Sequence, residues 1–210
     1  MKLYLSQVAP NPTKVMMYIA EREALGVTFD FERVDIELAK GAHRQPDFLA
    51  LNPFGTVPML ELDDGTRLLQ SLSIMDYFDD VFAGPKLEPE DPAARAKARD
   101  IERIADVRLA GLMARYGHAV NSPIGYPPNP ELAAQLLKDM QTPLNYLESL
   151  LEDGRPWLCG DSVTKADCTL QAHLHFLRFL KVDVLEGREG LLAWNERHSL
   201  RKEIAKLIYF

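Results

Sequence analysis

The hydrophobic pattern of this chain changes character once, and that change limits the fold more than any other feature. Up to residue 82, short runs with the two-residue period of a strand alternate with stretches that repeat as a helix does. From Ala93 onward no convincing strand pattern remains. The segment between, AGPKLEPEDP, is rich in proline and has no apolar period, which indicates a linker. We therefore expect an α/β domain over 1–82, a linker over 83–91 and an all-helical domain over 92–210.

The first domain is expected to have the order βαβ, α, ββ, α. Its clearest strands and helices are predicted at residues 2–5, 13–25, 28–35, 57–62, 66–69 and 72–82. The opening strand, helix and strand favour a right-handed crossover between parallel strands. Pro12 suits the first position of that helix, where its missing N–H costs nothing. Asp63, Asp64 and Gly65 indicate a tight turn between the two later strands.

The second domain is expected to be helical throughout. Apolar repeats predict helices over 93–118, 131–151, 168–180, 190–195 and 196–209. Pro143 should kink or break the second of these near residue 139, because proline removes a hydrogen bond and clashes with the preceding turn. Thr164 and Asp167 have the spacing of a capping box. The stretch that follows is apolar on nearly all sides, which places it in the middle of the domain.

The balance of charge argues against two classes of partner. The chain has 210 residues, with 31 acidic and 24 basic side chains and a formal net charge of −7. Nucleic acids and anionic membranes attract a basic face, so neither is expected to bind. No apolar stretch has the length of a secretory signal or a membrane span, and we expect a cytoplasmic protein. Cys159 and Cys168 have no second pair beside them, which favours buried thiols over a zinc or redox site.

Two motifs carry a family resemblance. The segment NPFGTVPMLELDDGTRLLQSLSIMDYF resembles the glutathione-binding signature of the soluble glutathione transferases, and WLCGDSVTKADCTL resembles the capping-box motif of their central helix. KGAHRQPDFLALNPFGTVP and PNPTKV are similar to a bacterial and fungal subgroup of that family. The resemblance implies a thioredoxin-like N-terminal domain, an all-helical C-terminal domain and a homodimer. It also implies glutathione as cosubstrate, with no metal.

The resemblance implies a set of glutathione-binding residues as well. Val57-Pro58 resembles the family's cis-proline turn, which leaves the peptide groups of the preceding residue free to pair with an extended ligand. Gln70 and Ser71 precede a helix whose N-terminus would receive the γ-glutamyl carboxylate, with Ser71 expected as the N-cap. Gln70 stands where most relatives have Glu, which weakens the expected hold on an ammonium group. The expected binding residues are Asn11, Lys14, His43, Thr56, Val57, Pro58, Gln70 and Ser71, with Arg44 beside His43.

Activation of the glutathione thiol requires a specific donor or base. Many relatives place Ser or Cys before the first helix, but this chain has Ala9 and Pro12 there, and neither can donate to sulfur. The remaining donors of the first domain are Tyr4, Ser6 and Asn11, of which Tyr4 is expected to lie in the core strand. Those of the second domain are His118, Asn121 and Ser122. In this family the helix that ends near His118 lines the cleft over the thiol, and imidazole has a pKa suited to a general base. Our hypothesis is that His118 and Asn11 replace the missing Ser; a helix-terminal histidine with no catalytic role is the alternative.

The electrophile pocket is expected to form from Leu112, Met113, Arg115, Tyr116 and Phe210. Such a mainly apolar lining implies small apolar electrophiles. His173 and His175 are two residues apart in a predicted helix, so they project to different faces and cannot form a metal pair. The leading function is conjugation of glutathione to an electrophile. The alternative is a non-catalytic module of the same fold that binds ligands or proteins, which Ala9 and Gln70 favour.

Overall fold

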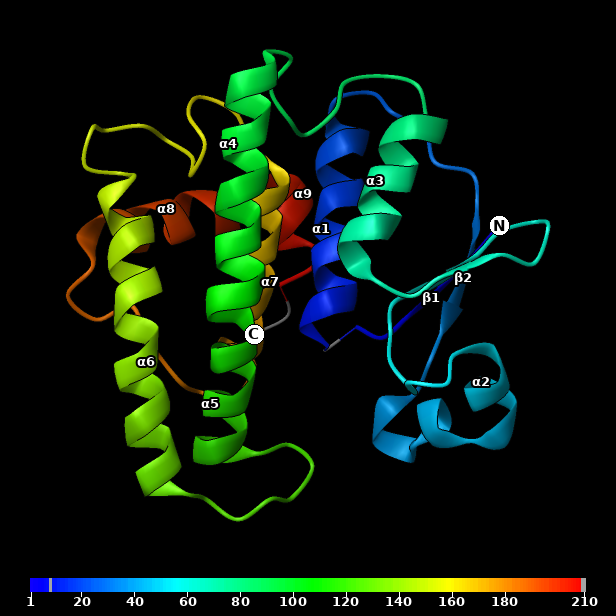
Figure 1. The fold of residues 1–210 in the computed structure, drawn as a ribbon, viewed down its shortest axis with the longest axis horizontal. Helices are drawn as coiled ribbons and strands as arrows, with labels where there is room; N and C mark the ends of the chain where they lie inside the picture. Colours follow the sequence, from blue (N-terminus) through cyan, green and yellow to red (C-terminus); the bar gives the residue numbers. More distant parts are fainter. Residues whose placement is uncertain (8, 209–210) are drawn as a thin grey trace. The chain divides into compact units, whose positions relative to one another are not determined.

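The computed structural model describes residues 1–7 and 9–208 and divides into two compact units, Met1–Lys86 and Leu87–Phe210. The division falls inside the segment predicted to be a linker. The first unit contains a mixed sheet with helices, and the second is helical (Figure 1). The fold class expected from the sequence is therefore confirmed.

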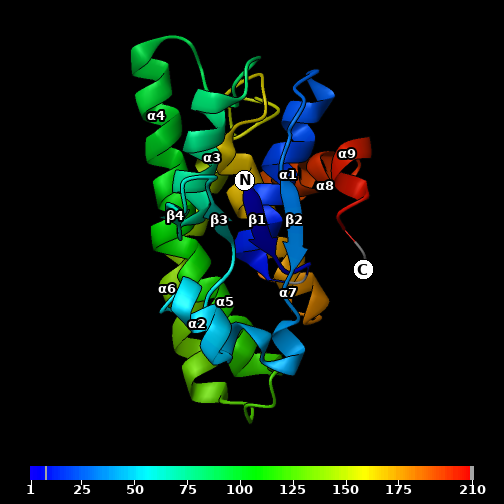
Figure 2. The ribbon, with the colours of Figure 1, turned by 90° about the vertical axis from the view of Figure 1, so that its right-hand side faces the viewer.

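The sheet of the first unit has the strand order β2-β1-β3-β4 (Figure 2). β1 (Lys2–Leu5) runs parallel to β2 (Glu32–Asp35) and antiparallel to β3 (Met59–Glu61). β4 (Arg67–Leu68) pairs antiparallel with β3 through the predicted tight turn. The parallel pair and the hairpin expected from the sequence are both present.

Helices pack on this sheet according to the alternation of its side chains. α1 (Pro10–Ala24) and α3 (Ser71–Val81) contact each other, and α3 also contacts β3. Tyr4 of β1 instead meets Phe48 of α2 (Pro46–Leu51), with ring centroids 6.2 Å apart. Short 3-10 turns at Leu38–Lys40 and Ala42–Arg44 lead into α2.

The first helix and the second strand of the first unit depart most from their predicted boundaries. α1 starts at Pro10 rather than at Pro12, so Pro10 takes the first helical position and Ala9 is the N-cap. β2 covers only the last part of the predicted strand. Phe29 and Phe31, which precede it, pack instead into an aromatic cluster, where Phe31 stacks on a ring of α3 at 5.3 Å between centroids.

In the second unit, one long helical run opens the domain. α4 (Pro92–Arg103) passes into a π-helical segment (Ile104–Ala110) and then into α5 (Gly111–Asn121), with α6 (Pro130–Ser149) beside them (Figure 1). α7 (Lys165–Phe179) contacts α4, the π-helical segment, α5 and α8 (Glu189–Ser199). Its first thirteen residues are buried, which confirms the prediction of a central helix. None of the helices described has the length and apolar character needed to cross a bilayer.

The starts of these helices follow simple local chemistry. α1, α2, α4 and α6 each begin with a proline. The predicted capping box of α7 is confirmed, with the Asp167 carboxylate accepting from the N–H of Thr164 at 2.8 Å. α6 runs through Pro143, so the predicted break is absent. The last predicted boundary is also wrong, because α8 continues to Ser199 and α9 spans only Lys202–Ala205.

Candidate functional site

The end of β1 lies beside the residues that lead into β3. Tyr4 pairs with Met59 in the antiparallel ladder of these two strands. Because the two strands are antiparallel, Ser6, which follows β1, and Val57, which lies two residues before β3, belong to the same end of the sheet. The Val57–Pro58 bond is cis, as the sequence predicted. Two predicted site residues, Ser6 and Val57, thus lie at the same end of the sheet.

Val57 presents an open backbone edge at this end. Its side chain is buried against Phe48 and Met59. Its backbone N–H and C=O, by contrast, take part in no hydrogen bond among the described residues. Backbone polar groups in folded proteins are nearly always paired. The edge at Val57 can therefore receive an extended peptide as one further strand.

α3 begins at the same end of the sheet, where β4 finishes. Leu60 pairs with Leu68 across the antiparallel strands β3 and β4, so the end of β4 and the start of β3 lie at the same end of the sheet. Gln70 is the N-cap of α3, with extended backbone angles, and no side chain of the described residues caps the helix. Ser71, predicted as the cap, is instead the first residue of the helix, because the backbone is still extended at Gln70. The Ser71 side chain is buried. The N–H groups of the first turn are available to an anion.

His43 lies in the 3-10 turn Ala42–Arg44, close in sequence to α2. Its Nδ1 is buried and has no hydrogen-bond partner within the described part of the chain. Burial, followed by the charge of Arg44, lowers the pKa of His43, so the ring is neutral at pH 7. A proton on the buried, unpaired Nδ1 would be costly, which favours the tautomer protonated at Nε2. Nε2 can then donate a hydrogen bond to a carboxylate.

A tight turn over 52–56 joins α2 to the start of β3. The Asn52 side chain is fully buried, and its Nδ2 donates to the carbonyl oxygen of Thr56 at 2.8 Å. Its Oδ1 accepts from the N–H of Phe54 at 3.1 Å. Gly55 has a φ of +58°, and a Cβ at this position would lie 2.9 Å from the carbonyl oxygen of His43. The turn therefore holds Thr56 in place and also touches the segment that carries His43.

The start of α1 holds two further predicted residues. Asn11 is exposed in the first turn, next to the N-cap Ala9, which has no side-chain oxygen to offer. The hydroxyl of Thr13 donates to the carbonyl of Ala9 at 2.9 Å and closes the loop. Lys14 is fully buried. Asn11 is thus better placed than Lys14 to meet a ligand that arrives from solvent.

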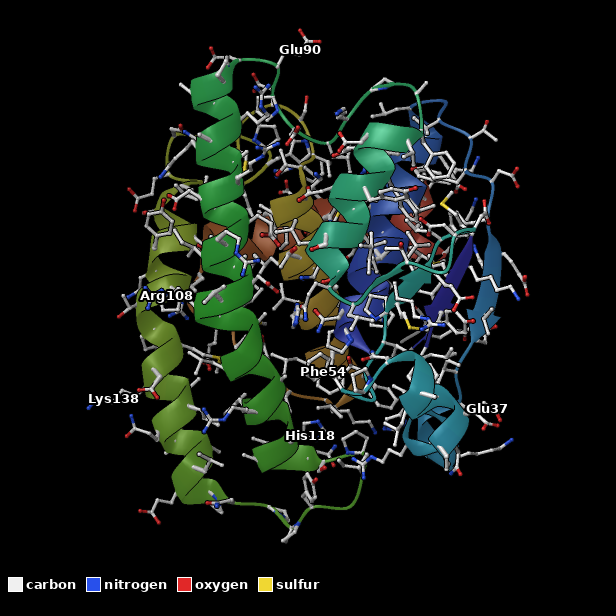
Figure 3. The ribbon with its side chains drawn as sticks, turned by 45° about the vertical axis from the view of Figure 1, so that its right-hand side comes forward. Glu37, Phe54, Glu90, Arg108, His118 and Lys138 are labelled. Atoms are coloured by element: carbon white, nitrogen blue, oxygen red, sulfur yellow. The ribbon has the colours of Figure 1, made fainter. Side chains whose placement is uncertain are left out.

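In the second unit, His118 lies near the end of α5 (Figure 3). Its Nδ1 is 3.0 Å from the Oγ of Ser122. The ring also lies near those of Tyr126 and Phe176, with centroid distances of 6.1 and 5.8 Å. Burial lowers the pKa of His118, so its imidazole is neutral at pH 7 and can accept a proton. The contact with Ser122 fixes the ring and leaves Nε2 for proton transfer.

The residues predicted to line an electrophile pocket divide between two faces of α5. Arg115 and Tyr116 follow Leu112 by three and four residues, so all three lie toward one face, and they are exposed or half-buried. Met113 points the other way and is fully buried in the core of the second unit. Phe210 lies outside the described residues.

The described ranges give no support for a metal site or for catalysis by the chain's own cysteines. Over residues 1–7 and 9–208, no group of His, Cys, Asp and Glu side chains is arranged to hold a metal ion. Cys168 is buried and forms no disulfide within the described part of the chain, as expected. Burial raises the pKa of Cys159 to about 12, so that thiol stays protonated at neutral pH.

Sequence reasoning missed three contributors: Asn52, Gly55 and Tyr126. The dipeptide Asn52-Pro53 is a common turn initiator and could have drawn attention to the first. The requirement for glycine at position 55 arises from a contact with His43, which is twelve residues away. Nothing in the local pattern reports such a contact. Tyr126 lies in a proline-rich segment that has no periodicity to interpret.

Comparison with known proteins gives a consistent result. The models of the glutathione S-transferase N-terminal and C-terminal domains match residues 9–81 and 130–197. The chain is similar to glutathione S-transferase 2 of Saccharomyces cerevisiae, with 32% identity over 212 residues that cover 99% of this chain and 89% of that protein.

Solved structures agree with this likeness. A glutathione S-transferase domain-containing protein from Marinobacter aquaeolei is 35% identical, with a TM-score of 0.83. The match covers 97% of this chain and 100% of that chain. A maleylacetoacetate isomerase from Methylobacterium extorquens, solved with bound malonate and glutathione, is 27% identical with a TM-score of 0.77, covering 99% and 96% of the two chains. The fold is thus a thioredoxin-like domain followed by a helical domain.

Proposed function

Since the chain belongs to the glutathione S-transferase family, we propose that it joins the sulfur of glutathione to small apolar electrophiles. One observation carries the proposal. The open backbone edge of Val57 and the uncapped start of α3 meet at the same end of the sheet. An extended peptide with a carboxylate at one end fits both features together.

Each part of glutathione has a proposed partner in the first unit. The γ-glutamyl carboxylate binds the first-turn N–H groups of α3 at Ser71, and Gln70 accepts from the ammonium group. The cysteinyl peptide group pairs with Val57, next to Pro58 and Thr56. Nε2 of His43 donates to the glycyl carboxylate. Arg44 adds positive charge nearby, and Lys14, being buried, contributes less.

The cysteine thiol needs more than the general field of a helix. Lowering its pKa of about 8.5 by about two units requires roughly 2.7 kcal/mol in favour of the thiolate. A helix N-terminus supplies about 0.3–1 kcal/mol, whereas one hydrogen bond to a charged group supplies about 1.5–3 kcal/mol. We assign that hydrogen bond to the exposed amide of Asn11, with Ser6 as a second donor. His118, held by Ser122, accepts the proton directly or through a water molecule.

The reaction then follows from the freed electron pair on sulfur. In a substitution, the pair forms the new C–S bond and the leaving group departs with the electrons of the broken bond. In an addition to an activated double bond, the proton is delivered to the neighbouring carbon. Leu112, Arg115, Tyr116 and Phe210 are the proposed contacts of the electrophile. Isomerisation by reversible thiolate addition is a variant, since an isomerase is among the similar structures.

Further properties of the family are extended to this chain as proposals. These are a homodimeric assembly, a cytoplasmic location and a role in detoxification. Exposed apolar side chains in both units, such as Phe54 and Val107, are compatible with a subunit interface. The size-exclusion profile of the purified protein tests the first of these.

An ultraviolet difference titration with glutathione tests the catalytic proposal. If the absorbance of the bound thiolate develops at a pH well below the pKa of the free glutathione thiol, the protein activates the thiol. If glutathione binds without that shift, a non-catalytic binding module becomes the better account, as Ala9 and Gln70 suggest. If glutathione does not bind at all, the proposed site is wrong.

A further inference from the structure

Two backbone segments of the first unit touch at Gly55 in a way that only glycine permits. A Cβ on residue 55 would lie 2.9 Å from the carbonyl oxygen of His43 and 3.2 Å from Cδ2 of Leu49. Real Cβ atoms essentially never approach another heavy atom closer than 3.0 Å. The Leu49 side chain can rotate away, but the His43 carbonyl can move only if its whole turn moves. The φ of +58° at Gly55 adds a second preference for glycine.

The turn that contains Gly55 is the more firmly held of the two segments. Asn52 is fully buried, and it donates to the carbonyl oxygen of Thr56 and accepts from the N–H of Phe54. Its own carbonyl accepts from the N–H of Gly55 at 3.0 Å. The 3-10 turn with His43 has no buried residue. A side chain at position 55 would therefore displace His43 rather than the turn around Asn52.

From this asymmetry we propose that Gly55 is a positioning residue that sets the preference for a ligand with a glycyl carboxylate. By letting the turn at 52–56 pack against the His43 carbonyl, it fixes where Nε2 of His43 meets that carboxylate. The inference rests on the proposed function, because it assumes that His43 binds the glycyl end of glutathione. It adds that residue 55, which has no side chain to offer the ligand, decides how strongly that end is recognised.

The test compares two unreactive ligands by calorimetry: S-methylglutathione and γ-glutamyl-S-methylcysteine, which lacks the glycine. A hydrogen bond to a charged group predicts that wild type binds the first about tenfold more tightly. In Gly55→Ala we expect this ratio to fall to about twofold while the Kd of the dipeptide stays within about twofold of wild type. In the same variant, the KM for glutathione should rise while kcat stays unchanged.

Matched variants separate positioning from general damage. Gly65 has a φ of +85° and no atom within 4 Å of an added Cβ, so Gly65→Ala carries the backbone strain without the contact and should keep the wild-type ratio. In His43→Ala the ratio should already be lost, and adding Gly55→Ala should change it no further. If Gly55→Ala does not fold, Asn52→Ala, which releases the same turn, must lower the ratio instead.

The outcomes are distinguishable. If wild type binds neither ligand, the proposed function fails and takes the inference with it. If wild type and Gly65→Ala show the preference and His43→Ala loses it, but Gly55→Ala retains it, the inference alone is overturned. Equal weakening of both ligands by Gly55→Ala also overturns it, because that result indicates general damage to the site.

Discussion

Nη1 of Arg22 lies 3.3 Å from Oδ1 of Asp79, and both side chains are buried within the first unit. The same guanidinium group donates to the carbonyl oxygens of Phe78, Phe82 and Pro85, all at 2.8–2.9 Å. One side chain of α1 thus ties together the end of α3 and the segment that follows it. The buried charge is paired and hydrogen-bonded, as such charges need to be.

Arg22→Met should destabilise the protein by about 3–5 kcal/mol, because it leaves a buried carboxylate and three carbonyls without this donor. Denaturation in guanidinium chloride measures the loss. Arg33→Met is the control, since Arg33 is exposed and should cost less than about 1 kcal/mol. Similar losses in the two variants would contradict the structural role of Arg22.

Asp167→Ala should destabilise the second unit more than an ordinary cap mutation does. The Asp167 carboxylate accepts from the N–H of Leu158, the N–H and hydroxyl of Thr164, and Nε1 of Trp194. Losing bonds to a buried charged group predicts about 3 kcal/mol or more. Asp91→Ala, at the exposed cap of α4, should cost about 1 kcal/mol. Equal losses in chemical denaturation would show that burial adds nothing to the cap.

His118→Ala should lower kcat by about 100-fold at pH 7 with little change in the KM for glutathione, because general bases typically contribute at least that much. The gap should narrow toward pH 8.5, where free thiol ionises unaided. Ser122→Ala keeps the ring and loses only its hydrogen bond, so a smaller loss is expected. Steady-state rates with an aryl halide across pH provide the measurement; unchanged turnover at every pH would remove His118 from the mechanism.

Gln70→Glu should tighten glutathione binding by about fivefold, because a carboxylate binds an ammonium group more strongly than an amide does. Calorimetry with S-methylglutathione measures the gain. The exposed Gln135→Glu makes the same change in charge on α6 and should leave Kd unaltered. A desamino analogue should show no gain with Gln70→Glu, and an equal gain would argue against contact with the ammonium group.

The buried His175 should make stability depend on pH. Burial, followed by the charge of Arg178, lowers its pKa to about 4, below the usual value of 6.5. Between these values the unfolded chain binds a proton here and the folded protein does not, so stability falls as pH falls below about 6.5. From pH 7.5 to 5.0, wild type should lose about 2 kcal/mol more than His175→Gln. Parallel losses would show that this ring does not titrate as described.

The sequence predicted well wherever a local pattern determines the structure. The capping box at Thr164, the hairpin around Gly65 and the buried helix α7 all depend on residues close together in the chain. Predictions failed where distant packing decides. Phe29 and Phe31 leave the predicted strand for an aromatic cluster with α3. The π-helical segment also went undetected, because the apolar repeat barely changes when one turn of helix widens.

The site was predictable to a similar extent. The motif around Pro58 indicated the cis bond and the start of α3. It placed the cap at Ser71, one residue too late, because the backbone of Gln70 is still extended and the helix begins at Ser71. The positions of Met113 and Lys14, both fully buried, depend on which helix face meets the core. Asn52 and Gly55 owe their roles to contacts that form only in the folded chain.

The lack of a capping side chain at the start of α3 has a consequence for the proposed binding of glutathione. α4 and α6 begin with a proline and a capping side chain, and α7 has its capping box, whereas α3 has neither device. Within the described residues, its first amides lack the capping partner that α4, α6 and α7 carry in their own sequence. In the proposed binding mode, the γ-glutamyl carboxylate of glutathione supplies this partner, so the bound substrate would complete the helix cap. Slower hydrogen exchange at the amides of Leu72 and Ser73 would then report the binding of glutathione, before any covalent bond to an electrophile forms.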